Sequence, residues 1–464
     1  MANSSGGSVV KSGLTFMYDM SSDKSFKGKP TTNYAHNANP ERFGANSLQG
    51  DTYSATGDGT WNVRHQDAIR VFSHAGTELT SHINTGVTDW TNTYHGIWTF
   101  DEELGYPVST MRDIGNGSWM YAGYGFDGTI NTPTKIGLTT GDKYVISWDQ
   151  WTTNTSKSAN CGLYGQNATN TGNGFHDGLS NQAGSTAFNT KTHTWERCWG
   201  IFTISANRGL DATWSQYNYG HYGGRGVTKV ANWQLEVGDT PSKFLYSTNT
   251  GVTDSRSSTE AIVDIAGGHS ITPTNLTYSM DSTTRKENFA FVNSTSRLDV
   301  ASGALSTQAS SGTWTIDMWL KRTTTNSIDS FLQTGSGNNF LWLIRNSTGE
   351  IQLENVGNTT GAWSYTPTND EYFHFCATGT GGTATVYING VSLGAQSLGS
   401  TTFSIAYANG ICIGQELDSN SATPSVDPNQ RFQGEIPSVK FYNRALSVGE
   451  VQQNYNASKS KYGF

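Results

Sequence analysis

Apolar and polar residues alternate along many short stretches of this chain, which is the pattern of half-buried β-strands. Residues 14–19 read LTFMYD, with Leu14, Phe16 and Tyr18 on one face. A second signal is the pair Asn389-Gly390 between alternating apolar residues, since a type I′ hairpin turn needs positive φ at both central positions. The sequence therefore predicts a chain made mostly of β-strands joined by tight turns.

The segment 432–456 predicts a strand, a bend and a short C-terminal helix. Ser447 and Glu450 have the spacing of a capping box at a helix N-terminus. Leu446 and Val451 have the spacing of the hydrophobic staple that accompanies it. The helix is therefore expected to begin just after Ser447.

The wording of this segment, FQGEIPSVKFYNRALSVGEVQQNYN, resembles the closing strand and terminal helix of laminin-G-like domains of the concanavalin-type lectin and glucanase fold. Residues 13–34 resemble the opening strand of the same family. The counterpart of the family's next segment, residues 261–279, comes far later in the chain. The resemblance therefore implies a domain inserted into a loop of the sandwich, where insertions are tolerated.

Three segments of the insert resemble strands of galactose-binding-like jelly rolls, the fold of many carbohydrate-binding modules. They are 139–153, 193–205 and 230–247. We therefore predict an all-β protein with two β-sandwich or jelly-roll domains and one short C-terminal helix. The expected parts are a polar N-terminal arm (1–12), a laminin-G-like sandwich (13–32 plus 248–464) and an inserted jelly roll (33–247).

Charge and hydropathy exclude some function classes. The net charge is −8 and no cluster of Lys and Arg is present, which argues against binding to nucleic-acid phosphates. No apolar run approaches the ~20 residues that span a bilayer. The first residues, MANSSGGSVVKSG, lack the apolar core of a secretory signal peptide. A lectin-like protein of this kind is expected to leave its cell by lysis, inside a virus particle.

The four cysteines are expected to be reduced, buried thiols, although one bridge in each domain is conceivable. They are Cys161, Cys198, Cys376 and Cys412, and none lies in CxxC spacing, so a zinc site is not supported.

Glycan hydrolysis needs two carboxylates on either side of the scissile bond. The family's glucanases carry them on one strand as E-x-D-x-E, and this chain has no such triplet. Asp317 stands alone, and the DEEL stretch at 101–104 lacks the spacing. No catalytic residue is assigned, and the expectation is that the chain is not an enzyme.

Sugar binding through aromatic rings is the favoured activity, because rings stack on apolar sugar faces and polar neighbours bond to hydroxyls. The alternative is that these rings are half core and half surface of jelly-roll strands. Trp148, Trp195 and Trp199 are interpreted as core packing. The predicted carbohydrate-binding residues are Trp214, Tyr217, Tyr219, His221, Tyr222 and Arg225, with Trp119, Tyr121 and Tyr124 as a second patch.

Calcium is a possible cofactor, because both resembled folds often bind it through loop carboxylates. Glu416, Asp418 and Asp427 supply carboxylates in one loop. The alternative is an ordinary solvated surface loop.

The pairing of these two modules resembles phage virion proteins, namely tail-fibre, adhesin or head-decoration proteins. The resemblance implies a non-enzymatic virion structural protein that is extracellular after host lysis and forms a homo-oligomer in the particle. Its expected partners are other virion proteins and host-surface polysaccharide, with no nucleic acid and no membrane span. The alternatives are a purely structural virion subunit and a bacterial polysaccharide-binding protein.

Overall fold

The computed structural model describes most of the chain, and for several strands it describes the backbone alone. The described residues are 8–33, 69–70, 96–104, 106–113, 121–125, 139, 141–153, 160–166, 175–178, 186–187, 191–203, 213–219, 226–245, 254–281, 284, 286–323, 328–337, 341–346, 348–355 and 360–464.

The chain divides into two compact units, and each is built from segments that are far apart in the sequence. Unit 1 comprises Met1–Lys29, Ser257–Tyr278 and Asn288–Phe464. Unit 2 comprises Pro30–Arg256 and Ser279–Glu287.

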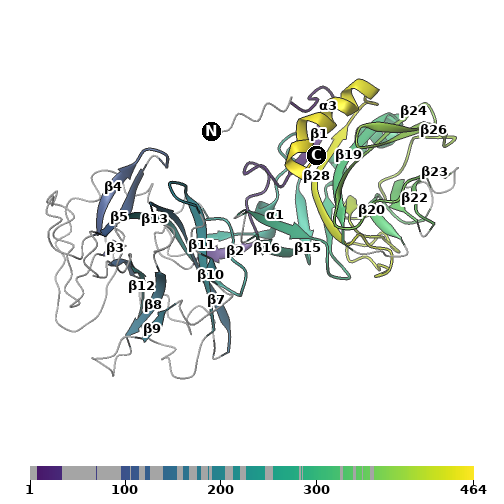
Figure 1. Ribbon diagram of the computed structural model, residues 1–464. Helices are drawn as coiled ribbons and strands as arrows, with labels where there is room; N and C mark the ends of the chain where they lie inside the picture. The colour runs from purple at the N-terminus through teal and green to yellow at the C-terminus, as the bar shows by residue number, and fades with distance from the viewer. Residues whose placement is uncertain are drawn as a thin grey trace. The chain divides into compact units, whose positions relative to one another are not determined.

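Unit 1 contains a six-stranded and a seven-stranded antiparallel sheet (Figure 1). In order, the six-stranded sheet is β1 (Leu14–Asp19), β28 (Gly434–Tyr442), β19 (Trp314–Arg322), β24 (Tyr372–Thr380), β25 (Thr383–Ile388) and β26 (Val391–Ser397). The seven-stranded sheet is β15 (Ile271–Thr274), β18 (Arg297–Val300), β27 (Ile411–Ile413), β20 (Asp329–Gln333), β21 (Leu341–Arg345), β22 (Glu350–Asn355) and β23 (Gly361–Ser364). Short helical segments are α1 (Ser258–Ala261), η5 (Ser302–Ala304) and α2 (Ser306–Ser311).

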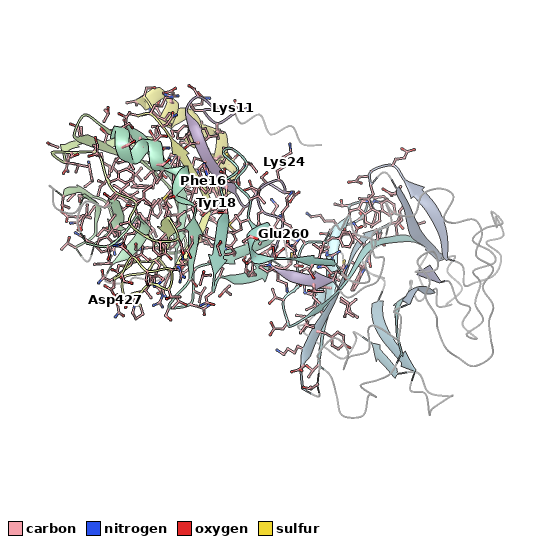
Figure 2. All side chains as sticks on the ribbon, turned by 180° about the vertical axis from the view of Figure 1, so that it is seen from behind. Lys11, Phe16, Tyr18, Lys24, Glu260 and Asp427 are labelled. Carbon is pink, nitrogen blue, oxygen red and sulfur yellow. The ribbon has the colours of Figure 1, made fainter. Side chains whose placement is uncertain are left out.

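The first strand of unit 1 pairs with the last one. Phe16 lies opposite Phe441 on β28, and their rings stack with centroids 4.7 Å apart. Phe16 and Tyr18 are fully buried within unit 1 (Figure 2). Alternation along β1 therefore directs every second side chain into the core, as the sequence pattern predicts.

The C-terminal helix α3 (Val448–Ser458) follows β28, and η6 (Lys459–Tyr462) continues it. The predicted capping box is confirmed: the Ser447 hydroxyl accepts from the Glu450 amide, and the Glu450 carboxylate accepts from the Ser447 amide at 2.9 Å. The predicted tight hairpin is confirmed as well, since Asn389 and Gly390 have φ of 50° and 77° between β25 and β26.

Unit 2 contains a six-stranded and a five-stranded antiparallel sheet. In order, the first is β10 (Thr186–Ala187), β11 (Glu196–Thr203), β7 (Lys143–Thr152), β13 (Gly226–Val237), β5 (Tyr106–Asp113) and β4 (Gly96–Asp101). The second is β3 (Ile69–Arg70), β6 (Tyr121–Gly125), β12 (Thr213–Tyr219), β8 (Asn160–Gln166) and β9 (Phe175–Gly178). The strands β2 (Thr31–Asn33) and β14 (Asp254–Arg256) pair with each other, so the two ends of the longer segment of unit 2 lie side by side. A further two-stranded sheet consists of β16 (Thr277–Met280) and β17 (Glu287–Ala290).

The predicted fold class is confirmed: the protein is all-β, with sandwich-like antiparallel sheets and one short C-terminal helix. Cys198, Cys376 and Cys412 are buried thiols, as expected, while the side chain of Cys161 lies outside the described residues. Among the described helices, none is long and apolar enough to cross a membrane.

Candidate functional site

The structure places the two predicted aromatic segments on neighbouring strands of unit 2. β12 carries Trp214, Tyr217 and Tyr219, and it pairs with β6 so that the backbone of Tyr219 lies opposite that of Tyr121. Tyr124 also lies on β6, and for all five residues only the backbone is described. The remaining predicted residues lie outside the described part of the chain: Trp119, His221, Tyr222 and Arg225.

The structure brings the three predicted calcium ligands together, but they bond to the protein itself. Glu416 accepts from the backbone amide of Asp427 at 3.0 Å. Burial, followed by the charges of Asp418 and Asp427, raises the pKa of Glu416 to about 7, although the bond from the Asp427 amide works against this. Among the described residues, no group of three or more His, Cys, Asp or Glu is arranged to hold a metal ion. Calcium binding at this loop stays a prediction.

A different aromatic cluster is fully described in unit 2, on one face of the six-stranded sheet. We call it the tryptophan patch, and it consists of Asp101, Trp151, His193, Trp195 and Lys229. Both tryptophans are half-buried and His193 is exposed. Four separate parts of the sequence therefore build a surface that combines rings with charged groups.

Strand register explains why these residues meet. Trp151 is the penultimate residue of β7 and lies opposite Lys229 on β13. β7 pairs with β13 along one edge and with β11 along the other. Trp195 immediately precedes β11 and packs against Ala231. The backbone amide of His193 bonds to the Thr152 carbonyl at 2.8 Å, which ties the turn before β11 to the end of β7.

The contacts within the patch are specific. The Lys229 ammonium lies 4.8 Å from the centre of the Trp151 ring, a cation–π contact. The His193 ring meets Trp151 edge-on, with centroids 5.3 Å apart. Lys229 also donates to the Asp101 carboxylate at 2.6 Å. The lysine thus links the ring to the carboxylate and holds both in place.

Asp101 is the polar anchor of the patch. Its other oxygen accepts from the backbone amides of Glu103 and Leu104, both at 3.1 Å. Burial acts to raise the pKa of Asp101, but the bonds from Lys229 and Leu104 outweigh it and keep the pKa below its usual value. The buried Trp195 Nε1–H also acts on the Asp101 carboxylate and helps to lower its pKa, although its geometry falls short of a regular hydrogen bond.

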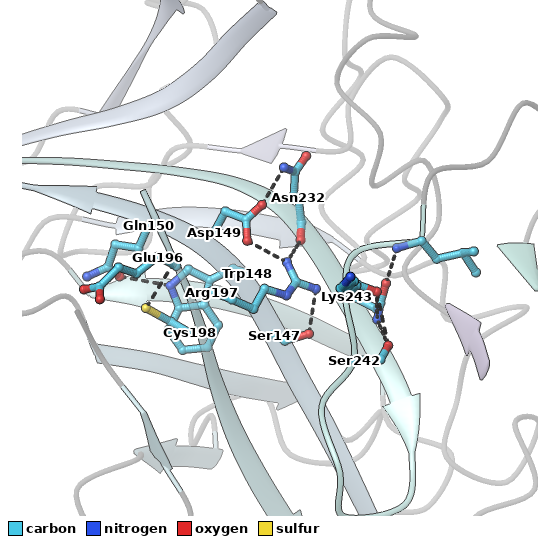
Figure 3. Close-up of polar contacts among 12 residues, drawn as sticks. Ser147, Trp148, Asp149, Gln150, Glu196, Arg197, Cys198, Asn232, Ser242 and Lys243 are labelled. Carbon is cyan, nitrogen blue, oxygen red and sulfur yellow. Dashed lines mark hydrogen bonds and ion pairs between the residues drawn. The ribbon is translucent and has the colours of Figure 1, made fainter. Parts of the chain in front are cut away.

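Beside the patch, a group of bonds fixes an irregular point of β13 (Figure 3). The ladder to β7 shifts register between Ala231 and Gln234, and Asn232 has φ of 56°, a left-handed conformation uncommon for a non-glycine residue. Asn232 donates to Asp149 at 2.6 Å, and the buried Arg197 donates to the Asn232 carbonyl at 2.6 Å. Arg197 also contacts Asp149 at 3.2 Å. These bonds set the path of β13 next to Lys229.

The sequence analysis missed this site. It interpreted Trp148, Trp195 and Trp199 as packing, and this is confirmed for Trp148 and Trp199, which are 0% and 6% exposed. Trp195 also packs, against Ala231, but it is half-buried, so part of its ring is exposed. The available signal was the spacing of Trp148 and Trp151, because residues three apart on a strand point to opposite faces.

Unit 1 offers a smaller aromatic surface on its seven-stranded sheet. Trp342 on β21 is half-buried and donates to the Ser330 hydroxyl at 2.9 Å. Glu354 on β22 lies opposite it in register, and burial raises its pKa. This surface has one ring where the tryptophan patch has two.

Residues 293–452 match the family model described as the concanavalin A-like lectin/glucanases superfamily. The match lies within unit 1 and covers its β18 to α3. The chain matches no curated protein.

Several solved structures are similar in fold. A mutant of Trypanosoma rangeli sialidase displaying trans-sialidase activity is 13% identical, with a TM-score of 0.33, over 44% of this chain and 31% of the sialidase. Domain 4 of AbnA, an extracellular arabinanase from Geobacillus stearothermophilus in complex with arabinotriose, is 16% identical, with a TM-score of 0.31, over 41% of this chain and 91% of that domain. The botulinum neurotoxin serotype D binding domain is 16% identical, with a TM-score of 0.32, over 43% of this chain and 49% of its own. This chain thus spans less than a third of the sialidase.

The expectation that the chain is not an enzyme is contradicted by these matches, because a sialidase stands among the proteins of similar fold. That prediction is withdrawn. At these identities the likeness concerns the fold alone, so it assigns no reaction to this chain.

Proposed function

We propose that this chain is a glycan-binding protein and that the tryptophan patch is its contact surface. The observation that carries the proposal is the joint placement of Trp151 and Trp195, half-buried, beside the exposed His193. Half-buried rings present an apolar face for a sugar to stack on, and the partly exposed Lys229, held in place by Asp101, supplies a fixed donor.

The ion pair argues for a neutral glycan. The charge of Lys229 is balanced by Asp101 at 2.6 Å, so little positive charge is left to attract an acidic sugar. The net charge of −8 would also repel a strongly acidic polymer.

We further propose that the protein is a structural component of a phage particle and contacts host-surface polysaccharide there. The support is the pairing of a concanavalin A-like segment at residues 293–452 with a second β-sandwich unit, together with the sequence resemblances of both. Virion localisation, assembly with other virion proteins and homo-oligomerisation are parts of this proposal.

A glycan array followed by calorimetry tests the binding proposal on the full chain. Wild type is expected to bind at least one neutral polysaccharide, and Trp151→Ala is expected to weaken this at least tenfold, or ~1.4 kcal/mol. Trp342→Ala, which removes a half-buried ring from unit 1, is the matched control and should bind as wild type does.

Two outcomes would contradict the proposal. One is that wild type binds no glycan; the other is that Trp342→Ala abolishes binding while Trp151→Ala leaves it intact, which would move the site to unit 1. The same samples should be assayed for newly released reducing ends, because turnover of a bound glycan would make the protein an enzyme.

A further inference from the structure

Three charged side chains lie buried at one end of the interior of unit 1. Arg322 ends β19, Asp329 begins β20 and Arg345 ends β21, and they are 5%, 0% and 5% exposed. Arg322 lies two residues after Leu320, and Arg345 lies two residues after Leu343, so each arginine shares a strand face with a core leucine. The two arginines therefore point inward from facing sheets, toward one carboxylate.

The carboxylate does not satisfy the two arginines. One oxygen of Asp329 lies 3.3 Å from Arg322 Nη1 and 3.5 Å from Arg345 Nη1, which is longer than the ~2.7–2.9 Å of a charge-assisted hydrogen bond. Buried atoms without a hydrogen-bond partner are Arg322 Nε, Arg345 Nε, Arg345 Nη1 and Asp329 Oδ1. Three buried arginine N–H groups thus lack an acceptor beside this carboxylate, whereas buried polar groups are normally paired.

The charges are unbalanced as well. Two guanidinium groups surround one carboxylate, which leaves one positive charge inside the sandwich. Among the described residues, the charged groups that act on Arg345 are Arg322 and Asp329, so Asp329 is the one carboxylate that acts on it. Burial lowers the pKa of Arg345, with the charge of Arg322 adding to it, as expected for a cation short of counter-charge. An uncompensated buried charge is costly.

We propose that this cluster, Arg322, Asp329 and Arg345, binds one small monovalent anion, chloride in ordinary salt solution. A single anion would restore neutrality and accept from the free N–H groups of both arginines. The burial of all three side chains restricts the ligand to an ion of about that size. The site is separate from the tryptophan patch, so this proposal does not rest on glycan binding.

Bromide replaces chloride and can be located by anomalous scattering. Crystals of the full wild-type chain soaked in sodium bromide are expected to show an anomalous peak between Arg322 and Arg345. An adventitious ion only, meaning bromide at the surface but none at the cluster, overturns the proposal, as does a water molecule there.

Thermal unfolding gives a second test in solution. At fixed ionic strength, replacing gluconate by chloride is expected to raise the Tm of wild type by a few degrees, because a ligand of the folded state stabilises it. Arg345→Met should remove this chloride dependence, and Arg444→Gln, a surface arginine paired with Glu450, should retain it. Chloride dependence that persists in Arg345→Met contradicts the proposal.

Discussion

Each unit places an aspartate, a lysine, a histidine and a tryptophan on one face of a sheet, but only in unit 2 are the lysine, the histidine and the tryptophan at least partly exposed. In unit 1 the set is Asp317, His374 and Lys440 beside Trp319. The carboxylate bonds to Lys440 at 2.9 Å and to His374 at 3.1 Å, and all four residues are at most 1% exposed.

In unit 1, segments near the two ends of the chain pack over Asp317, Trp319, His374 and Lys440 and bury them. Asn454 on α3 donates to Asp317 at 3.0 Å and to the Tyr442 hydroxyl at 2.9 Å. Its own carbonyl oxygen accepts from the Val10 amide at 2.8 Å. Tyr462 stacks on Trp319 with centroids 4.3 Å apart. These contacts turn a polar sheet face into a buried network.

In unit 2 the corresponding face keeps Trp151 half-buried, and the Lys229 side chain is 23% exposed. The same residue types can therefore serve as structure or as surface. What separates the two is whether another part of the chain covers them, because a ring needs a free face to stack on a sugar.

The largest effect is expected from Asp317→Asn, which leaves the Lys440 charge buried without a partner. Such a loss costs about 3–5 kcal/mol. The matched change in unit 2, Asp101→Asn, should cost about 1 kcal/mol, because the partly exposed Lys229 can turn to water. Urea unfolding of both variants measures the difference, and equal losses would break the distinction between a covered and an open set.

The Asp317 network also gives a pH dependence. Burial acts to raise the pKa of Asp317, but the charges of Lys440 and His374 outweigh it and hold the pKa well below its usual value. A lowered folded pKa stabilises the protein above the unfolded pKa of about 4 and loses this as the pH falls below it. Asp317→Asn should therefore flatten the decline in Tm below about pH 4.

Asn232→Ala should cost about 2 kcal/mol, because alanine is strained at a left-handed φ and the bond to Asp149 is lost. Asn232→Gly, which tolerates this conformation, should recover part of the loss. If the register shift of β13 near Asn232 holds Lys229 in its place in the tryptophan patch, glycan affinity should fall in both variants. If calorimetry shows that both variants bind glycan as tightly as wild type does, the role of Asn232 is limited to stability.

Glu416 shows the opposite behaviour to Asp317, because it is buried and burial is the main influence on its pKa, whereas Asp317 has Lys440 beside it. Its folded pKa of about 7 lies above the unfolded value, so its stabilisation is present at acid pH and lost as the pH rises toward 7. Glu416→Gln should remove this loss and raise the Tm at pH 7.5 by a few degrees. The exposed Glu371→Gln is the control.

The same experiment tests the predicted calcium site. Added calcium should raise the Tm of wild type at neutral pH but not that of Glu416→Gln. A Tm that calcium leaves unchanged would remove Glu416, Asp418 and Asp427 as ligands.

Local patterns predicted the strands and caps of unit 1 well, because alternation, the Asn389-Gly390 turn and the Ser447 cap depend on neighbouring residues. The tryptophan patch was not predictable in this way. It joins Asp101, Trp151 and Lys229, which meet only through strand pairing across the sheet. Whether a tryptophan is buried also depends on segments that are distant in the sequence. The density of aromatic residues alone therefore favoured a different stretch, Trp214 to Arg225.

The smallest effect is expected from destabilising α3, the helix that covers the Asp317 network of unit 1. Ser447→Ala removes the N-cap of α3 and should cost about 1 kcal/mol. Because α3 holds Asn454 against Asp317, amides of β19 and β24 should exchange hydrogen faster, while those of β7 and β13 in unit 2 stay unchanged. Ser447→Asp, another good N-cap, should restore the slow exchange. Unchanged exchange in Ser447→Ala would show that the network closes without the cap, and that the covered face is held by its own ion pairs.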